Sequence, residues 1–230
     1  QALTQRNALL KQLNERGGDM EQLEFWDHVL TSKGAVIMQA RIAAIQELEQ
    51  LAMRIHEKLS GSKEVIRLVY QPSYDPVQKP EGQFALPIQT SLQRTGFSLA
   101  QLQLGFAAKL ADARREEIAR GITTIGPHRD ELRVMCNGVD LTDFGSRGQI
   151  RTAILSMKLA EVDWYKQKTG EWPVLLMDEI LAELDTDRRA YLLDYLDHTE
   201  QALLTTTDMN LFPHGFHEQC ERWQVAQGNV

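Results

Sequence analysis

Short apolar runs alternate with helical segments over the second half of the sequence. Helical periodicity covers about 149–168 and 186–197, and the β-type runs lie at 122–125, 131–136, 173–177, 202–206 and 223–226. Strands that alternate with helices predict a layered α/β sheet with helices on its faces. The run at 173–177 is continuously apolar, as expected of a strand that is buried on both faces.

The first half of the sequence has the periodicity of helices. Apolar residues recur at three- and four-residue steps over 3–13, 20–30 and 37–59, and a further helical stretch covers 99–120. Residues 64–70 alternate like a strand, and 71–90 hold four of the seven prolines, which predicts an irregular link. We therefore expect a helical arm at 1–115 and an α/β part at 116–230. The strand near 64–70 can pair with the α/β part.

Composition narrows the class of protein. The hydrophobic fraction of 43% and the charged fraction of 25% are those of a soluble globular protein, and no apolar run approaches a membrane span. A net charge of −7 argues against nucleic-acid binding over the whole surface, although local basic patches remain open. The sequence starts at Gln1 without a signal-peptide pattern, so we expect a cytoplasmic piece of a longer protein.

The cysteines give no metal-type spacing. Cys136 and Cys220 stand far apart in the sequence, and the segment from His214 to Cys220 is better explained as polar loop residues than as a ligand set. We assign no structural metal.

Two carboxylates follow the apolar run at 173–177. Asp178 and Glu179 would lie at the carboxyl end of a strand, where open α/β sheets bind ligands. An aspartate there can hold Mg²⁺, and a neighbouring glutamate can polarise an attacking water in nucleotide hydrolysis. A strand that ends in two acidic residues is also common at the solvated start of a turn, so the pair alone does not decide the chemistry.

Small and polar residues precede the helix predicted at 149–168. The segment Ser146-Arg147-Gly148-Gln149 would place a hydroxyl and unpaired backbone N–H groups at a helix N-terminus, which favours phosphate binding. The alternative is an ordinary helix cap, with Ser146 and Gln149 forming a capping box. The two interpretations are compatible.

The order of these motifs resembles the C-terminal half of an ABC-type P-loop ATPase head with an inserted helical arm. Ser146, Arg147, Gly148 and Gln149 resemble the signature motif, 174–179 resembles Walker B, and 182–185 resembles the D-loop with Asp185. Residues 205–208 occupy the switch position, where Thr206 and Thr207 stand in place of the histidine of transporters. The signature departs from the transporter pattern at Arg147.

Within that superfamily, the segment Gly126-Pro-His-Arg-Asp130 and the string Glu183-Leu-Asp-Thr-Asp-Arg-Arg189 are similar to the RecF family of DNA replication and repair proteins. This resemblance implies a head-to-tail homodimer that binds ATP and Mg²⁺, with Asp178 on the metal, Glu179 on the water and the signature closing over the γ-phosphate of the other protomer. It also implies slow ATP hydrolysis, a role in the SOS response, junctions of single- and double-stranded DNA as ligand, RecR- and RecO-type mediators as partners, and no membrane.

Basic residues that could contact DNA phosphates lie in two clusters and one turn. The clusters are Arg114, Arg115 and Arg120, and Lys166 and Lys168. For any single one of these residues, a solvated helix face is the favoured interpretation. His128 and Arg129 could form a DNA-facing turn, and a hydrogen-bonded loop is an equal alternative for them. Arg188 and Arg189 are expected to make packing or dimer contacts near the D-loop.

The sequence lacks the phosphate-binding loop. No Gly-x-x-x-x-Gly-Lys-Ser/Thr occurs in the 230 residues, so we expect this chain alone to be inactive as an ATPase. Two other classes stay open: a nucleotide-binding subunit of an ABC transporter, and a non-catalytic interaction module whose ATPase motifs are vestigial.

Overall fold

The computed structural model describes residues 1–77, 94–213, 215–216, 220–225 and 227. The chain forms two compact units, Gln1–Glu161 and Val162–Val230. This division falls inside α5 (Arg147–Thr169). The boundary predicted near residue 115, between a helical arm and an ATPase head, stays a prediction. No helix among the described residues combines the length and the apolar character that a membrane crossing needs.

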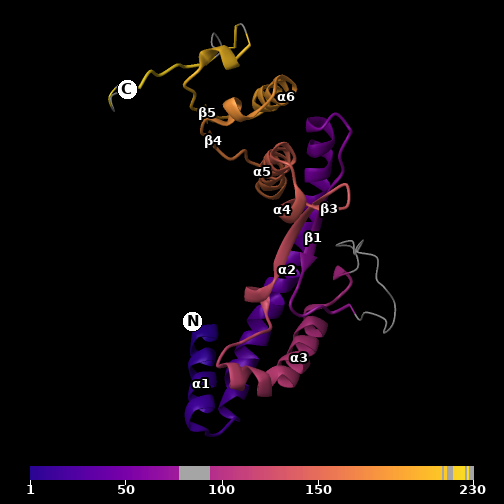
Figure 1. The fold of residues 1–230 in the computed structure, drawn as a ribbon, viewed down its shortest axis with the longest axis vertical. Coiled ribbons are helices and arrows are strands. Elements are labelled where there is room, and N and C mark those ends of the chain that lie inside the picture. Colours follow the sequence, from indigo (N-terminus) through magenta and orange to yellow (C-terminus); the bar gives the residue numbers. More distant parts are fainter. Residues whose placement is uncertain (78–93, 214, 217–219, 226, 228–230) are drawn as a thin grey trace. The chain divides into compact units, whose positions relative to one another are not determined.

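Three helices pack together in the first unit: α1 (Ala2–Arg16), α2 (Gln22–Leu59) and α3 (Leu99–Arg120) (Figure 1). Buried residues of one cluster join α1 to the start of α2: Leu10, Leu13 and Leu23. A second cluster joins α2 to α3: Ala35, Met38, Leu102 and Phe106. The apolar stripes of the predicted helices are therefore packing surfaces.

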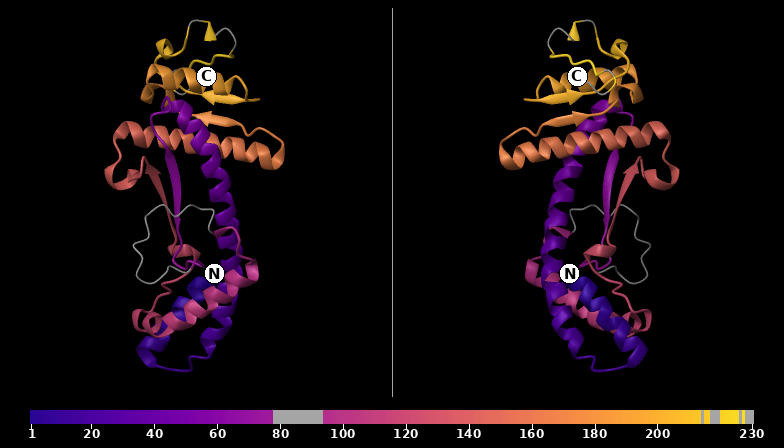
Figure 2. Two further views of the ribbon diagram at one scale, coloured as in Figure 1. Left: turned by 90° about the vertical axis from the view of Figure 1, so that its right-hand side faces the viewer. Right: turned by 90° about the vertical axis from the view of Figure 1, so that its left-hand side faces the viewer.

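The helix α2 is continuous over 38 residues, where the sequence predicted separate helical stretches at 20–30 and 37–59 (Figure 2). Gly34 lies in the middle of this helix, and a Cβ there would approach Phe106 Cε1 to 2.8 Å. The small residue at 34 therefore permits a close crossing of α2 and α3 and does not mark a helix end.

A buried arginine ties the three helices together. Arg6 is fully buried and pairs with Asp27 and Glu117, at 2.7 Å in each case. The Arg6 guanidinium also donates to the Thr123 hydroxyl at 2.7 Å. Because breaking a buried charge pair leaves an uncompensated charge, this network fixes how α1, α2 and α3 meet.

A three-stranded antiparallel sheet lies in the same unit, in the order β1 (Ile66–Gln71), β2 (Glu131–Cys136) and β3 (Val139–Asp140). Ile66 pairs with Cys136 and Gln71 with Glu131, so the strand predicted near 64–70 does join the strand predicted at 131–136. Alternate residues of β1 are buried, and Leu68 and Tyr70 pack on Ile42 and Ile45 of α2.

The second unit holds the end of α5 together with β4 (Leu175–Met177), α6 (Thr186–Leu196) and β5 (Ala202–Leu204). A short 3-10 helix, η3 (Ile180–Glu183), follows β4, and η4 (Met209–Leu211) follows β5. The strands β4 and β5 pair in parallel with Leu175 opposite Ala202. The helices and strands predicted between residues 149 and 206 are confirmed to within a few residues.

Two predicted strands are wrong or untested. Residues 122–125 form no strand, because side chains take up their backbone N–H groups: Thr123 donates to Asn7 Oδ1 at 2.8 Å and Thr124 to Glu117 Oε1 at 2.6 Å. At the C-terminal end, 223–225 are not a strand and Ala226 lies outside the described residues.

Candidate functional site

The carboxyl ends of β4 and β5 lie side by side, because the two strands run parallel in register. Met177 pairs with Leu204, and the Thr205 N–H donates to the Met177 carbonyl at 3.0 Å. Asp178 and Glu179 therefore leave the sheet directly beside Thr205, at the edge where α/β sheets place ligand-binding side chains.

The Thr205 hydroxyl connects both predicted catalytic residues. It donates to Asp178 Oδ1 at 2.5 Å and accepts the Glu179 backbone N–H at 3.0 Å. This oxygen thus fixes the carboxylate of Asp178 and the backbone of Glu179 relative to β5. The sequence placed residues 205–208 at the switch position and singled out Thr206 and Thr207, whereas Thr205, the first residue after β5, makes the contact with Asp178.

Thr206 and Thr207 behave differently from Thr205. The Thr206 hydroxyl and Asp208 form a small turn, in which Asp208 N–H donates to Thr206 Oγ1 at 3.1 Å. Asp208 then caps η4 by accepting from Asn210 N–H at 2.9 Å. Thr207 is exposed. A switch role for Thr206 and Thr207 stays a prediction, while Thr205 is the threonine in contact with Asp178.

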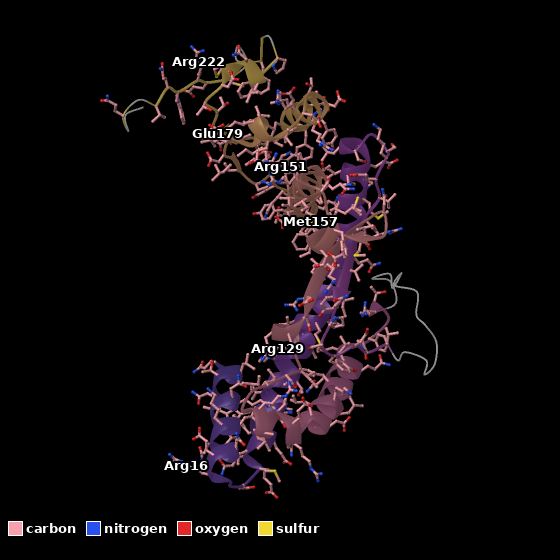
Figure 3. The ribbon with its side chains drawn as sticks, in the orientation of Figure 1. Arg16, Arg129, Arg151, Met157, Glu179 and Arg222 are labelled. Carbon is pink, nitrogen blue, oxygen red and sulfur yellow. The ribbon has the colours of Figure 1, made fainter. Side chains whose placement is uncertain are left out.

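Glu179 adopts a left-handed backbone conformation, with φ 50° and ψ 16°. Residues other than glycine rarely take up this conformation, which costs on the order of 1–3 kcal/mol and tends to occur at functional sites. The strain turns the chain sharply from β4 into η3. Asp178 is exposed and Glu179 is half-buried, so both carboxylates remain near solvent. Figure 3 labels Glu179 among the side chains of the chain.

Asp185 caps α6. Its Oδ1 accepts the Arg188 N–H at 3.0 Å, and its Oδ2 lies 3.0 Å from Arg188 Nη1. Arg189 Nε donates to the Leu181 carbonyl at 2.8 Å and so holds η3 against α6. The contacts of both arginines are packing contacts within the chain, which was one of the two predicted roles. The Asp185 side chain is half exposed, at 56%, and can still face another protomer.

Ser146 and Gln149 form the predicted capping box at the start of α5. Gln149 N–H donates to Ser146 Oγ at 3.2 Å, and Ser146 N–H donates to Gln149 Oε1 at 3.1 Å. The hydroxyl and amide that resemble signature residues are therefore also the residues that shape the helix N-terminus. Ser146, Arg147 and Gly148 are exposed, so an anion can approach this end of the helix.

The two glycines beside Ser146 have different reasons to be small. A Cβ on Gly145 would lie 2.5 Å from the Leu141 carbonyl oxygen, so the chain itself requires glycine there. A Cβ on Gly148 would meet nothing within 4 Å. The packing of this chain therefore does not account for Gly148, whereas a ligand or partner that approaches the backbone would.

A short helix, α4 (Leu141–Phe144), leads into the signature loop and is anchored by Asp140. Asp140 Oδ1 accepts the Thr142 N–H at 2.9 Å, and Oδ2 contacts Arg133 Nη1 at 2.8 Å. The hydrogen bond from the Thr142 backbone, followed by the bond from Arg133, lowers the pKa of the Asp140 carboxyl. The carboxylate thus stays ionised while it holds the loop entry.

The segment Gly126–Asp130 is built as a hydrogen-bonded turn around Asp130. That carboxylate accepts from the Tyr70 hydroxyl at 2.5 Å, from Arg41 Nη1 at 2.8 Å and from the Ser73 N–H at 2.8 Å. Burial, with help from the Asp130 charge, raises the pKa of Tyr70. Asp130 therefore joins α2 to β1 and β2.

His128 and Arg129 hold the same turn closed. The ring nitrogen Nε2 of His128 lies 3.3 Å from the Thr123 carbonyl, and Arg129 Nε donates to that carbonyl at 3.3 Å. These bonds favour the hydrogen-bonded loop over the DNA-facing turn, although both side chains keep exposed surface.

The predicted DNA-contacting residues lie in different units: Arg114, Arg115 and Arg120 on α3, and Lys166 and Lys168 at the end of α5. Arg114 pairs with Asp27 at 2.9 Å and Arg120 with Glu116 at 2.8 Å. The ammonium of Lys166 lies 3.6 Å from the centroid of the Trp172 ring, and that of Lys168 lies 5.7 Å from the Trp164 ring. Arg115 is exposed. DNA binding by these residues stays a prediction.

Comparison with known proteins gives one consistent result. Curated relatives described as DNA replication and repair protein RecF are 40% identical in Halothermothrix orenii (208 residues, 90% of this chain and 51% of the relative) and 36% identical in an Exiguobacterium species (228 residues, 99% and 57%). A Synechococcus relative of the same description is 36% identical over 234 residues, which cover 100% of this chain and 57% of the relative. The chain thus spans about half of the length of these relatives. A scan against models of protein families gave no match.

Solved structures agree with the sequence comparison. Two structures of the recombination mediator protein RecF in the RecFOR pathway, described as RecF-ATP and RecF-ATPrS, superpose with TM-scores of 0.74 and 0.73. Both are 27% identical to this chain and cover 91% of it and 51% of the solved chain. The mixed α/β architecture is that of the C-terminal half of an ABC-type ATPase head.

Proposed function

The chain belongs to the RecF family and corresponds to the C-terminal portion of its members, and we propose from this premise that it supplies half of a composite ATP site in a DNA replication and repair protein. The observation that carries the proposal is the arrangement of Asp178 and Glu179 around the Thr205 hydroxyl at the carboxyl end of β4. The relatives act in replication and repair by name, and the solved neighbours are ATP complexes.

The proposed ATP site is formed by residues of two protomers. Asp178 is exposed and oriented by Thr205, and its carboxylate suits a Mg²⁺ ion that accompanies ATP. Glu179, in its strained conformation, orients the attacking water. Ser146, Gly148 and Gln149 of the second protomer present a helix N-terminus to the γ-phosphate, where the dipole and the N–H groups favour negative charge.

In this proposal ATP controls whether two protomers are held together as a dimer. ATP holds two protomers head to tail with Asp185 at their contact, and hydrolysis releases them. Such a clamp needs only slow turnover, and it would hold DNA at junctions of single and double strands together with RecR- and RecO-type mediators. The comparisons give no support to the transporter class, since these curated relatives and both solved neighbours carry the RecF description.

The proposal is tested in the full-length protein with Glu179→Gln. This change keeps the side-chain size but removes the group that orients water, so ATP should still bind and hydrolysis should fall by about 10²–10⁴-fold. We expect dimers that persist with ATP and retain DNA, as measured by light scattering and by DNA retention. If ATP changes neither the oligomeric state nor DNA retention in the parent and in the variant, the clamp is wrong. Glu171→Gln, at an exposed position of the same unit, is the control with an equal change of charge.

A further inference from the structure

The Gln149 side chain contacts two separate segments. Its Oε1 accepts the Ser146 N–H at 3.1 Å, which closes the capping box. Its Nε2 donates to Glu64 Oε1 at 3.0 Å. The shape of the signature loop therefore depends on a carboxylate that lies 85 residues away in the sequence, between the end of α2 and the start of β1.

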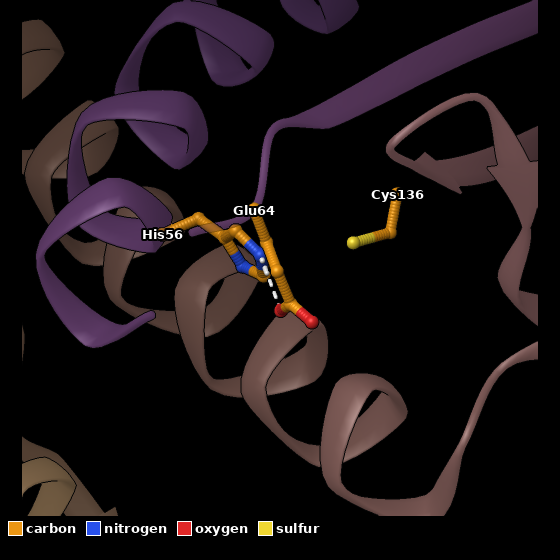
Figure 4. Close-up of side chains that lie close together, drawn as sticks. All are labelled: His56, Glu64 and Cys136. Atoms are coloured by element: carbon orange, nitrogen blue, oxygen red, sulfur yellow. Dashed lines mark ion pairs between the residues drawn. The ribbon is translucent and has the colours of Figure 1, made fainter. Parts of the chain in front are cut away.

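Glu64 faces a buried histidine with its other oxygen. Its Oε2 lies 3.4 Å from His56 Nε2; the imidazole is fully buried, and the Glu64 side chain is 18% exposed (Figure 4). The other ring nitrogen of His56, Nδ1, lies 3.0 Å from Ser156 Oγ on α5. The pair thus bridges α2 and α5 from the inside of the unit.

The proton positions follow from the hydrogen bonds. The Ser156 hydroxyl donates to the Thr152 carbonyl at 2.7 Å, so its oxygen accepts from His56 and Nδ1 carries a proton. The Nε2 atom then faces the Glu64 carboxylate. At 3.4 Å the contact meets the distance of an ion pair but not the geometry of a hydrogen bond. His56 is therefore fixed to α5 through Nδ1 and lies against Glu64 through Nε2.

Both contacts act on the first turns of the signature helix. Gln149 lies in the first turn of α5, and Ser156 lies two turns further along the same helix. His56 lies in the last turn of α2, the helix that also packs on α1, α3 and β1. The helix α5 is therefore held at two points, by His56 in the last turn of α2 and by Glu64 in the segment between α2 and β1.

We propose that Glu64 and His56 are positioning residues for the signature motif, which hold Gln149, and through it Ser146, in the shape that receives the γ-phosphate bound by the other protomer. This role rests on the proposed function. It assigns neither residue a contact with ATP. It explains why a carboxylate with little exposure and a buried imidazole lie behind an exposed helix N-terminus.

Cys136 forms the third side of this group, and its potential ligand atom lies within 4.8 Å of those of His56 and Glu64. Burial, followed by the Glu64 charge, raises the pKa of the Cys136 thiol. A protonated thiol can donate to the carboxylate, whereas a metal ligand has to be a thiolate. The contacts of Glu64 with Gln149 and His56 carry the proposal, and bound zinc is an outcome that would replace it.

The experiment is a double-mutant cycle in the full-length protein with Glu64→Ala, Gln149→Ala and the double variant. Glu64→Gln is a milder form, and Glu57→Gln is the matched control at an exposed position in the same helix turn as His56. ATP affinity of the monomer and ATP-dependent dimerisation are measured separately. We expect the monomer affinity to stay within about twofold and Glu64→Ala to weaken dimerisation by about tenfold or more, the size of one charged hydrogen bond.

The double variant should be no worse than Gln149→Ala alone, because both changes remove the same contact. Additive losses, unchanged dimerisation in Glu64→Ala, or about one zinc ion per chain that is lost in Glu64→Ala would each overturn the proposal. A variant whose thermal midpoint drops together with monomer affinity would show a general folding role and would also overturn it.

Amide exchange without nucleotide separates this proposal from the function on which it rests. Gln149 N–H donates to Ser146 Oγ in the capping box, and Ile150 N–H donates to the Ser146 carbonyl, so Glu64→Ala should speed their exchange while the control leaves it unchanged. If the parent forms no ATP-dependent dimer, the proposed function fails, and the exchange of these two amides still decides whether Glu64 holds the loop.

Discussion

Gly148 is a position where stability and function should respond in opposite directions. It lies in the first turn of α5 and is exposed, and a Cβ added there would have no atom within 4 Å, so alanine fits the chain without a clash. Because glycine is the poorer helix former by up to about 1 kcal/mol, Gly148→Ala should leave the unfolding free energy unchanged or raise it slightly. ATP-dependent dimerisation of the full-length protein should nevertheless weaken, because the methyl group would stand where the proposed site brings the γ-phosphate to the backbone.

Thermal unfolding and light scattering with ATP measure the two quantities for Gly148→Ala. A variant that dimerises as the parent does would show that the first turn of α5 receives no phosphate. A variant that is strongly destabilised would contradict the open surroundings of Gly148 instead.

Single residues also show which contacts of the candidate site can be predicted from the sequence and which cannot. The capping box of Ser146 and Gln149 follows from a local spacing, and the structure confirms it. The contact of Gln149 with Glu64 joins residues 85 positions apart, so no local pattern predicts it. The sequence placed all three threonines of 205–207 at the switch position, but which of them meets Asp178 depends on the register of β4 and β5.

At the scale of elements, Gly34 lies inside a helix as Gly148 does, but a Cβ added there would meet another helix. It lies in the interior of α2, where helix propensity alone would favour alanine by about 1 kcal/mol. A Cβ at this position would approach the ring of the fully buried Phe106 to 2.8 Å, so α2 and α3 would have to move apart. We expect Gly34→Ala to destabilise the chain by about 1–3 kcal/mol, as overpacked cores do.

Urea unfolding measures the stability of Gly34→Ala and of Gly148→Ala. The two variants can be compared directly because each replaces a glycine in a helix by alanine. Equal effects on the urea midpoint would mean that the crossing of α2 and α3 is looser than the structure shows. Restoration of stability by Phe106→Leu in the Gly34→Ala background would identify the ring as the cause.

Periodicity predicted the helices and most strands because each stripe of apolar residues corresponds to one buried face. It failed at 122–125, where a strand-like run is held by side chains of Asn7 and Glu117. It also divided α2 near Gly34, where the glycine serves a helix crossing. In both cases the deciding partner comes from another part of the chain, and a single-sequence pattern contains no information about it.

At the scale of the whole molecule, the proposed function assigns this chain a cap for a γ-phosphate and carboxylates for Mg²⁺ and water, but its sequence has no phosphate-binding loop. The helix N-terminus at Ser146 and the exposed Asp178 offer too few groups to hold a triphosphate, because their contacts exchange for water at little net gain. Isothermal titration of the 230-residue chain with ATP and Mg²⁺ should therefore show no binding at micromolar concentrations, while the full-length protein binds. Micromolar affinity in the chain alone, abolished by Asp178→Asn, would mean that the carboxyl end of β4 grips nucleotide by itself and that the division of the site between two halves is wrong.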